Sequence, residues 1–159
     1  RRTFKANDYV YSFDVSTLVS SDQPVVAERA MYGDNRAWAH DSIGVTTPAT
    51  TWYLAEGSTA GGMETFILVQ NPGGVPAEVT LSFMTDGGPR PGPSATLPPG
   101  TRRTFKANDY VYSFDVSTLV SSDQPVVAER AMYGDNRAWA HDSLGSYLQS
   151  SVPGLLHDL

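Results

Sequence analysis

Apolar and polar positions alternate along this chain in short runs, the pattern expected of half-buried β-strands. The clearest alternation covers residues 77–84, where every second side chain is apolar. Residues 64–70 (ETFILVQ) form the most apolar run and stop at the turn sequence NPGG. No stretch shows the period of an amphipathic helix convincingly. The pattern therefore predicts an all-β fold.

Further strands are expected at residues 52–55, 101–107, 126–133 and 138–144. Pro and Gly crowd residues 86–100, which indicates turns around a candidate short strand at 94–97. Residues 115–120 fit either a strand or a single helical turn. Short strands with turns about every 8–12 residues predict an immunoglobulin-like antiparallel β-sandwich, with a small β-barrel as the alternative.

A long internal repeat divides the chain. Residues 1–44 occur again as residues 102–145 with one change, Ile43 to Leu144. The offset is about the size of one small all-β domain. We therefore expect the back half of a preceding unit at 1–44, a Thr/Pro linker at 45–50, a complete sandwich unit at 51–145 and a C-terminal tail at 146–159. With two back halves and one front half, residues 1–44 are expected to complete a unit with an upstream front half, or to pair with the same segment of another chain.

Composition narrows the function classes. The chain has 17 acidic and 11 basic residues and a net charge of −6, which argues against nucleic acid and anionic membranes as partners. It has no Cys, so it has neither a disulfide framework nor a thiol site. No apolar run is long enough to span a bilayer. A Cys-free chain rich in Thr, Ser, Gly and Pro fits an extracellular bacterial repeat.

Few residues suggest site chemistry. His40 and His141 are repeat equivalents followed by Asp, but one His per unit is a thin ligand set, so a strand-edge role is favoured over a metal or a general base. Asp135, Asn136 and Asp142 offer oxygen ligands of the kind that calcium takes between extracellular domains, although Asp and Asn also simply form turns. No cofactor is predicted.

The repeated Glu-Arg pair is unusual because it lies inside an otherwise apolar strand. Neighbours on a strand face opposite sides, so Glu129 and Arg130 do not pair with each other. The member that points inward needs a partner, and Glu56 or Arg137 is expected to supply it. A structural ion pair is the favoured interpretation.

Aromatic residues suggest a binding surface. Six aromatics of one unit could form a flat platform on which sugar rings stack, with core packing as the alternative: Trp52, Tyr53, Tyr110, Tyr112, Tyr133 and Trp139. Of these, Trp52, Tyr53, Tyr133 and Trp139 are the favoured candidates. The Gly-rich segment 56–62 lacks the Lys-Ser/Thr of a phosphate-binding loop and the Gly-x-Ser-x-Gly of hydrolases, and a flexible hairpin loop is expected there. No nucleophile, metal or cofactor motif supports an enzyme.

The sequences TTWYLAEGST, ETFILVQNP, LPPGTRR, VVAERAMY and HDSIG together resemble a repeat of large secreted or surface proteins of actinobacteria and related bacteria. This family is described as an immunoglobulin-like domain of unknown function, often present in several copies. The resemblance covers nearly all of residues 1–145 and implies an extracellular location without catalytic residues. We therefore expect a structural module of a surface stalk, layer or self-assembling filament that binds copies of itself. The alternative is an adhesion module that binds cell-surface polysaccharide.

Overall fold

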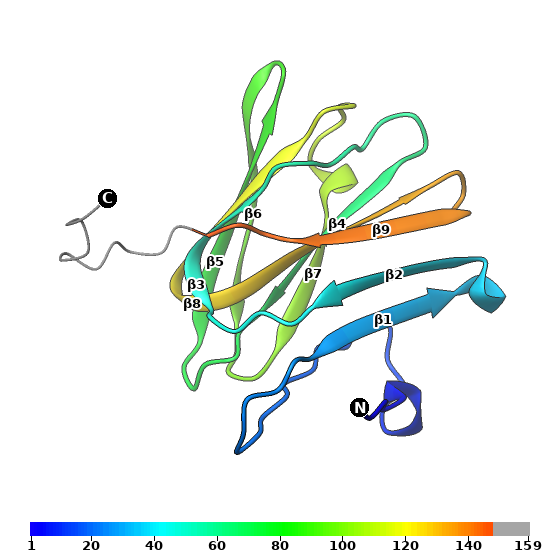
Figure 1. Cartoon of the computed structure of the whole chain (residues 1–159). Helices are drawn as coiled ribbons and strands as arrows, with labels where there is room; N and C mark the ends of the chain where they lie inside the picture. The colour runs from blue at the N-terminus through cyan, green and yellow to red at the C-terminus, as the bar shows by residue number, and fades with distance from the viewer. Residues whose placement is uncertain (148–159) are drawn as a thin grey trace, which may run out of the picture.

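The computed structural model describes residues 1–147 and is all-β and antiparallel, as predicted (Figure 1). Most of the predicted tail at 146–159 lies outside these residues. Three single-turn 3-10 helices accompany nine strands. The elements are η1 (Ala6–Asp8), β1 (Glu28–Gly33), η2 (Asp34–Arg36), β2 (Trp38–Ile43), β3 (Ala49–Leu54), β4 (Glu64–Gln70), β5 (Ala77–Thr85), β6 (Gly88–Leu97), β7 (Arg102–Lys106), η3 (Ala107–Asp109), β8 (Ser117–Gly134) and β9 (Trp139–Leu144).

The second unit is organised around the long strand β8. The first part of β8 lies between β5 and β3, and its second part lies between β4 and β9. The strand orders are therefore β6-β5-β8-β3 and β7-β4-β8-β9, with β8 shared by both sheets. Most of the segment 115–120 and all of 126–133, expected as separate elements, thus belong to one 18-residue strand, Ser117–Gly134. A strand that passes from one sheet into the other curls the unit into a half-barrel.

The core fills the space between these sheets and is built from the apolar positions of the alternating strands. Trp52 is only 1% exposed, and its indole N–H donates to the carbonyl oxygens of Ala49 (3.1 Å) and Val126 (2.9 Å). A buried Trp with a satisfied N–H contributes much apolar burial without an unpaired donor. The other large members of this core are Leu54, Ile67, Val69, Val79, Leu81, Phe83, Leu97, Phe105, Val120 and Val126.

The proline-rich segment differs from its prediction. Instead of turns around a short strand at 94–97, residues 88–97 form the ten-residue strand β6. β6 is an edge strand that pairs only with β5, so prolines that cannot donate hydrogen bonds are tolerated along it. Prolines on an edge also hinder pairing with another chain.

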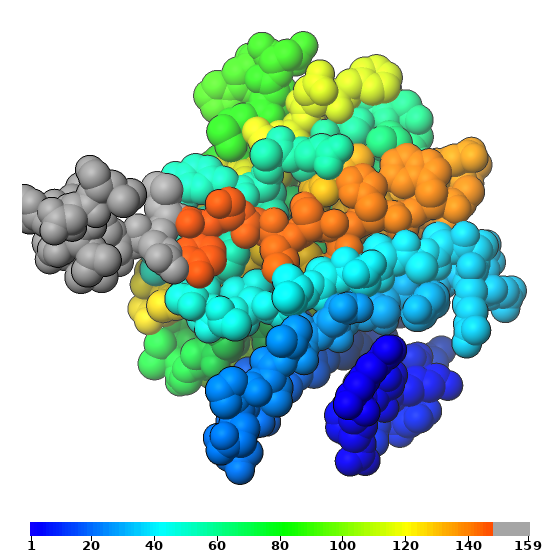
Figure 2. Space-filling model, in the orientation of Figure 1, coloured from blue at the N-terminus to red at the C-terminus, as the bar shows by residue number. Residues whose placement is uncertain are grey.

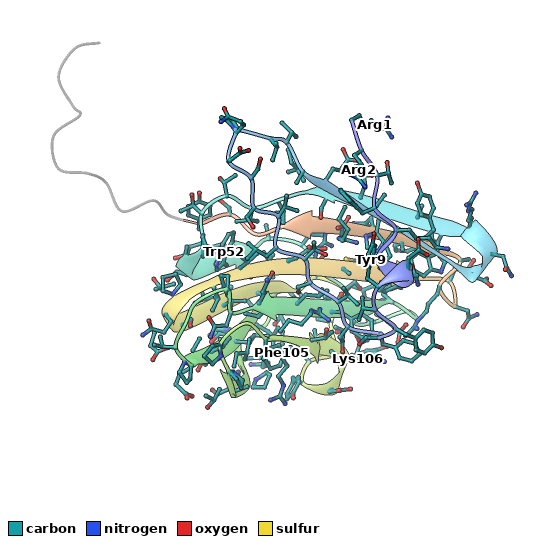
Figure 3. The ribbon with its side chains drawn as sticks, turned by 90° about the horizontal axis from the view of Figure 1, so that it is seen from below. Arg1, Arg2, Tyr9, Trp52, Phe105 and Lys106 are labelled. Atoms are coloured by element: carbon teal, nitrogen blue, oxygen red, sulfur yellow. The ribbon has the colours of Figure 1, made fainter. Side chains whose placement is uncertain are left out.

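The two copies of the repeat adopt different structures. In the first copy, the elements are η1 and the β1–β2 hairpin with η2 at its tip, whereas residues 16–27, equivalent to the first part of β8, are in no strand. In Figures 1 and 3 the N-terminal segment, which carries Tyr9, runs outside the two sheets, while Trp52 and Phe105 lie on their strands. The predicted linker also ends early, because β3 begins at Ala49. The difference follows from the strands that are available, since one front half cannot serve two back halves.

Candidate inter-repeat interface

The most distinctive site of the molecule is the contact between equivalent hairpins of the two copies. The first hairpin is β1–β2, and the second is the end of β8 with β9; their registers are the same, because Glu28 pairs with Ile43 as Glu129 pairs with Leu144. In Figure 2, β2 (cyan) lies along β9 (orange). Arg29 and Ser42 are 13 positions apart in sequence, and they are direct cross-strand partners. Both hairpins thus present the same two faces.

We name these faces by their charged residues. The Arg face of the first hairpin carries Arg29, Trp38 and His40, and its equivalents in the second hairpin are Arg130, Trp139 and His141. The Glu face of the second hairpin carries Glu129, Tyr133 and Asp142, and its equivalents in the first are Glu28, Tyr32 and Asp41. Within the second unit, Arg130 pairs across the sheet with the core residue Ile67, so the Arg face points inward and the Glu face outward.

Arg29 forms the centre of the contact. Its guanidinium donates to Glu129 Oε1 (2.5 Å) and to the carboxylate of Asp142, both on the Glu face of the second hairpin. It also donates to Ser42 Oγ (3.3 Å) on its own hairpin. The Asp142 side chain is 1% exposed, whereas the Arg29 side chain remains 36% exposed, so the ion pair is buried on its carboxylate side. One guanidinium held by two partly buried carboxyls is among the stronger kinds of polar contact.

His40 extends the contact on the same face. Its Nδ1 lies 3.2 Å from Asp142 Oδ1, but without the geometry of a hydrogen bond, so neither ring nitrogen has a hydrogen-bond partner among the described residues. Burial lowers the pKa of His40 below its ordinary value, although the Asp142 carboxylate acts in the opposite direction. The imidazole is therefore favoured in its neutral form at neutral pH.

An aromatic contact adjoins the charged one. Trp38 stacks on His40 with ring centroids 5.8 Å apart, and its edge meets Tyr133 of the second hairpin at 5.4 Å. Gly33 allows this arrangement, because a Cβ built there would lie 1.8 Å from the Trp38 ring. Burial raises the pKa of Tyr133, which keeps its phenol neutral. The aromatic edge-to-face contact joins the two copies through apolar area as well as charge.

The Glu129 carboxyl beside Arg29 has a perturbed pKa. Burial, together with the neighbouring Asp142 carboxyl, raises the pKa of Glu129 to about 7, and Arg29 opposes this rise. Near neutral pH, therefore, Glu129 is partly protonated beside the Arg29–Asp142 ion pair.

Glu64 fixes the outer surface beside Tyr133. It accepts hydrogen bonds from Lys106 Nζ (2.7 Å) and Arg137 Nε (2.7 Å), and Arg137 lies over the Tyr133 ring at 5.5 Å. These cations, Arg137 foremost, hold the pKa of Glu64 at about 2. The Tyr133 side of the Glu face is thus set by the second unit itself.

A smaller contact also joins the copies. Asp14 accepts hydrogen bonds from Thr104 Oγ1 (2.7 Å) and Arg102 (2.5 Å) on the edge strand β7. The Thr104 hydroxyl, followed by Arg102, lowers the pKa of Asp14. This carboxylate is largely exposed, so the bond contributes little to stability.

Inside the second unit, the equivalent arginine has a different partner. Arg130 points inward, is 2% exposed, and forms an ion pair with Glu56 of the front half at 3.2 Å. This confirms the prediction that an inward member of the Glu-Arg pair is matched by Glu56. Arg130 also donates a hydrogen bond to Ser143 Oγ (3.0 Å), whereas the Nε of Arg130 has no hydrogen-bond partner among the described residues. Burial lowers the pKa of Arg130, which the Glu56 carboxylate opposes.

The predicted sugar platform does not come together as expected. Trp52 is buried in the core and is unavailable to a ligand, while its strand neighbour Tyr53 is 43% exposed on the opposite face. Tyr133 lies under Trp38 of the first hairpin, and Trp139 remains partly exposed on the Arg face of the second. The most exposed aromatics of the second unit are Tyr110 and Tyr112, which the sequence had suggested, and Phe114, which it had not; all three lie on the loop between η3 and β8. In the sequence, these three aromatics stand at every second position, which places them on one side of an extended segment.

The calcium candidates are also separated. Asp135 and Asn136 form the tip of the second hairpin with positive φ angles of 50° and 53°, whereas Asp142 lies in the middle of β9 and faces Arg29. Across residues 1–147, no three His, Asp or Glu side chains are placed to hold a metal ion together. The tip residues therefore serve the turn, in which Asp and Asn tolerate positive φ.

The Gly-rich segment is also not a flexible hairpin loop. Ser58 and Thr59 are buried, and the Ser58 N–H donates to Thr65 Oγ1 (3.0 Å). Asn108 donates to the carbonyl oxygens of Thr59 (3.1 Å) and Met63 (2.8 Å). The segment is thus fastened to β4 and η3 and positions Glu56 against Arg130.

Comparison with known proteins identifies the fold alone. No family model matches the chain, and no curated protein matches it. A solved structure, Thermotoga maritima 1070, covers 64% of this chain and 96% of its own at 17% identity with a TM-score of 0.57. The Anabaena sensory rhodopsin transducer covers 54% of this chain and 83% of its own at 23% identity with a TM-score of 0.45. Within residues 1–147, no helix has the length and hydrophobicity needed to cross a bilayer.

Proposed function

We propose that this chain is a non-catalytic structural repeat module in which copies of the repeat bind one another. The hairpin contact is the observation that supports this most directly, because two copies of one sequence meet there through complementary faces. Arg29 supplies the positive charge and Asp142 a negative charge, and Glu129, which is partly protonated near neutral pH, adds a second carboxyl acceptor. Every residue of this contact is present in both copies. A sequence that recognises itself suits a repeated assembly.

The proposed setting is a stalk, layer or filament outside the cell or on its surface. A Cys-free, acidic chain and the resemblance to secreted repeats support this setting. The exposed apolar side chains of the first copy, among them Phe13 and Val26, favour association with further copies.

Light scattering coupled to size exclusion tests the proposal over a concentration series. The 17.2 kDa chain is expected to form larger species as concentration rises. The matched control carries Val19→Asp and Val25→Asp, which place charge on exposed apolar positions of the first copy and leave the second unit unaltered. We expect this variant to associate less. A monomer at every concentration would contradict self-association.

A polysaccharide-binding function is the second candidate, and the loop aromatics favour it. Tyr112 is 81% exposed and Phe114 is 69% exposed, so both rings are open to a sugar face. Affinity electrophoresis in gels that contain cell-wall polysaccharide measures such binding. Retardation that Tyr112→Ala abolishes would favour an adhesion module, and equal mobility in every gel would exclude it for those glycans.

A further inference from the structure

Residues 16–27 of the first copy are in no strand and expose apolar side chains. Their equivalents in the second copy pair with β3 and β5 of the front half. Val25 is 60% exposed and Val19 is 55% exposed, whereas their equivalents Val126 and Val120 are both 0% exposed. Phe4 shows the same contrast with Phe105, at 64% against 3%. These side chains have the same sequence context, so only their partners differ.

The second unit shows which partner this surface takes. Val120 pairs with Trp52 of β3 and with Leu81 of β5, and Val126 pairs with Ala49 of β3. The next part of β8 pairs with β4. All three strands belong to the front half, residues 49–101. The partner is therefore a polypeptide of this sequence and not a generic apolar surface.

We propose that residues 1–44 are a docking site for a second copy of the front half, which binds in the register of the second unit and forms the missing sheets. The inference rests on the proposed function, because it also requires repeats to recognise each other. The bound front half would bury Val19 and Val25 and supply strand partners to residues 16–27. It gives the self-association a defined surface, register and partner.

Docking of a front half would compete with the hairpin contact. In the second unit the Arg face is covered by the front half, and Arg130 is paired with Glu56. In the first copy the same face is covered by Glu129 and Asp142 of the neighbouring unit. One guanidinium face cannot be covered fully by both. Docking of a front half on residues 1–44 is therefore expected to displace the hairpin contact.

Thiol labelling tests the docking site, because the chain contains no cysteine. Val25→Cys introduces a single thiol at a position that is exposed now and buried after docking. The probe is the polypeptide of residues 45–101, added to the full chain. A second chain carries an additional copy of residues 45–101 directly before Arg1, so that a poorly soluble free polypeptide does not prevent the test. Tyr11→Cys is the matched control, because Tyr11 and its equivalent Tyr112 are both highly exposed.

We expect the added front half to slow maleimide labelling of the Val25→Cys thiol by about 100-fold or more, and to leave the Tyr11→Cys thiol reactive. Adding Val19→Asp should abolish the protection. Equal labelling of both thiols in the extended chain would overturn the proposal. Asp142→Asn weakens the competing contact and should raise the apparent affinity for the polypeptide several-fold. An unchanged affinity would overturn the competition.

The outcome remains separable from that of the proposed function. If the Val25→Cys thiol stays reactive while the chain still self-associates in light scattering, only the front-half docking site fails. If the chain stays monomeric but the extended chain protects the thiol, the repeat completes itself within one polypeptide, and the assembly role fails instead.

Discussion

The two copies of the 44-residue repeat have nearly the same sequence but lie in different surroundings. In the second copy, Arg130 is buried against Glu56 and Val126 lies in the core. In the first, Arg29 reaches a neighbouring unit and Val25 is exposed to solvent. The hairpin forms in both copies, whereas the strand before it forms only where the front half pairs with it. The hairpin thus forms without a front half of its own, whereas the preceding strand needs pairing with a front half.

The largest expected effect separates the two valines. Val126→Asp places a carboxyl in the core without a partner and should lower the free energy of unfolding by about 4 kcal/mol or more. Val25→Asp makes the same change on an exposed side chain and should alter it by less than about 0.5 kcal/mol. Urea denaturation followed by tryptophan fluorescence measures both. Similar losses for the two variants would show that the first copy is packed after all.

Arg130 should affect global unfolding of the second unit, whereas Arg29 should affect release of the first hairpin. Arg130→Ala removes a buried side chain from the second unit and should lower its free energy of unfolding by about 2 kcal/mol. Arg29→Ala should leave that value nearly unchanged and release the first hairpin instead. Global unfolding is measured by urea denaturation, and hairpin release by amide exchange in NMR spectra. An Arg29→Ala variant with a protected hairpin would contradict the role given to Arg29.

The pH dependence of the hairpin contact follows from Glu129. Its pKa in the contact is about 7 rather than the ordinary 4.5, so its protonated form is favoured there. This contribution is complete below pH 4.5 and is lost as the pH rises through about 7, amounting to about 1–2 kcal/mol. The lowered pKa of His40 acts oppositely, favouring the contact above its ordinary value of 6.5.

Glu129→Gln isolates these two effects. The variant keeps a neutral side chain at all pH values, so only His40 still titrates, and the contact should now weaken as the pH falls. Amide exchange of the first hairpin between pH 5 and 8 measures this. Glu28→Gln, at the exposed equivalent position, is the control and should retain the wild-type profile. Identical pH profiles of amide exchange for the two variants would show that Glu129 does not determine the pH dependence of the hairpin contact.

The smallest expected effect lies at the edge of the contact. Glu64 is held at a pKa of about 2 by Arg137 and Lys106, so its contribution is present above pH 4.5 and is lost as the pH falls toward 2. Glu64→Gln should lower the stability of the second unit by about 1 kcal/mol at pH 7. Thermal unfolding at pH 7 and pH 2.5 should show the difference shrinking. A constant difference would mean that packing, not charge, explains it.

Sequence reasoning succeeded where the signal is local. The apolar run at 64–70 and the alternation at 77–84 located β4 and β5. Strand geometry predicted that one member of the Glu129–Arg130 pair points inward and gave Glu56 as one of two candidate partners; the inward member is Arg130, and it pairs with Glu56. Two features depend on how strands pair and were therefore not predicted. The proline-rich residues form β6 because it lies at a sheet edge, and β8 is one continuous strand because both sheets share it. The contact of Arg29 with Asp142 was also out of reach, since identical segments carry no signal of which copy packs on which.

A double-mutant cycle between Arg29 and Asp142 tests the central claim most directly. The opening free energy of the first hairpin is measured by NMR amide exchange for Arg29→Ala, Asp142→Ala and both together, with Arg29 and Asp41 as a control cycle. We predict a coupling of about 1–2 kcal/mol between Arg29 and Asp142 and none between Arg29 and the exposed Asp41. Additive effects in the first cycle would contradict the account, because the two copies would then not recognise each other through these faces.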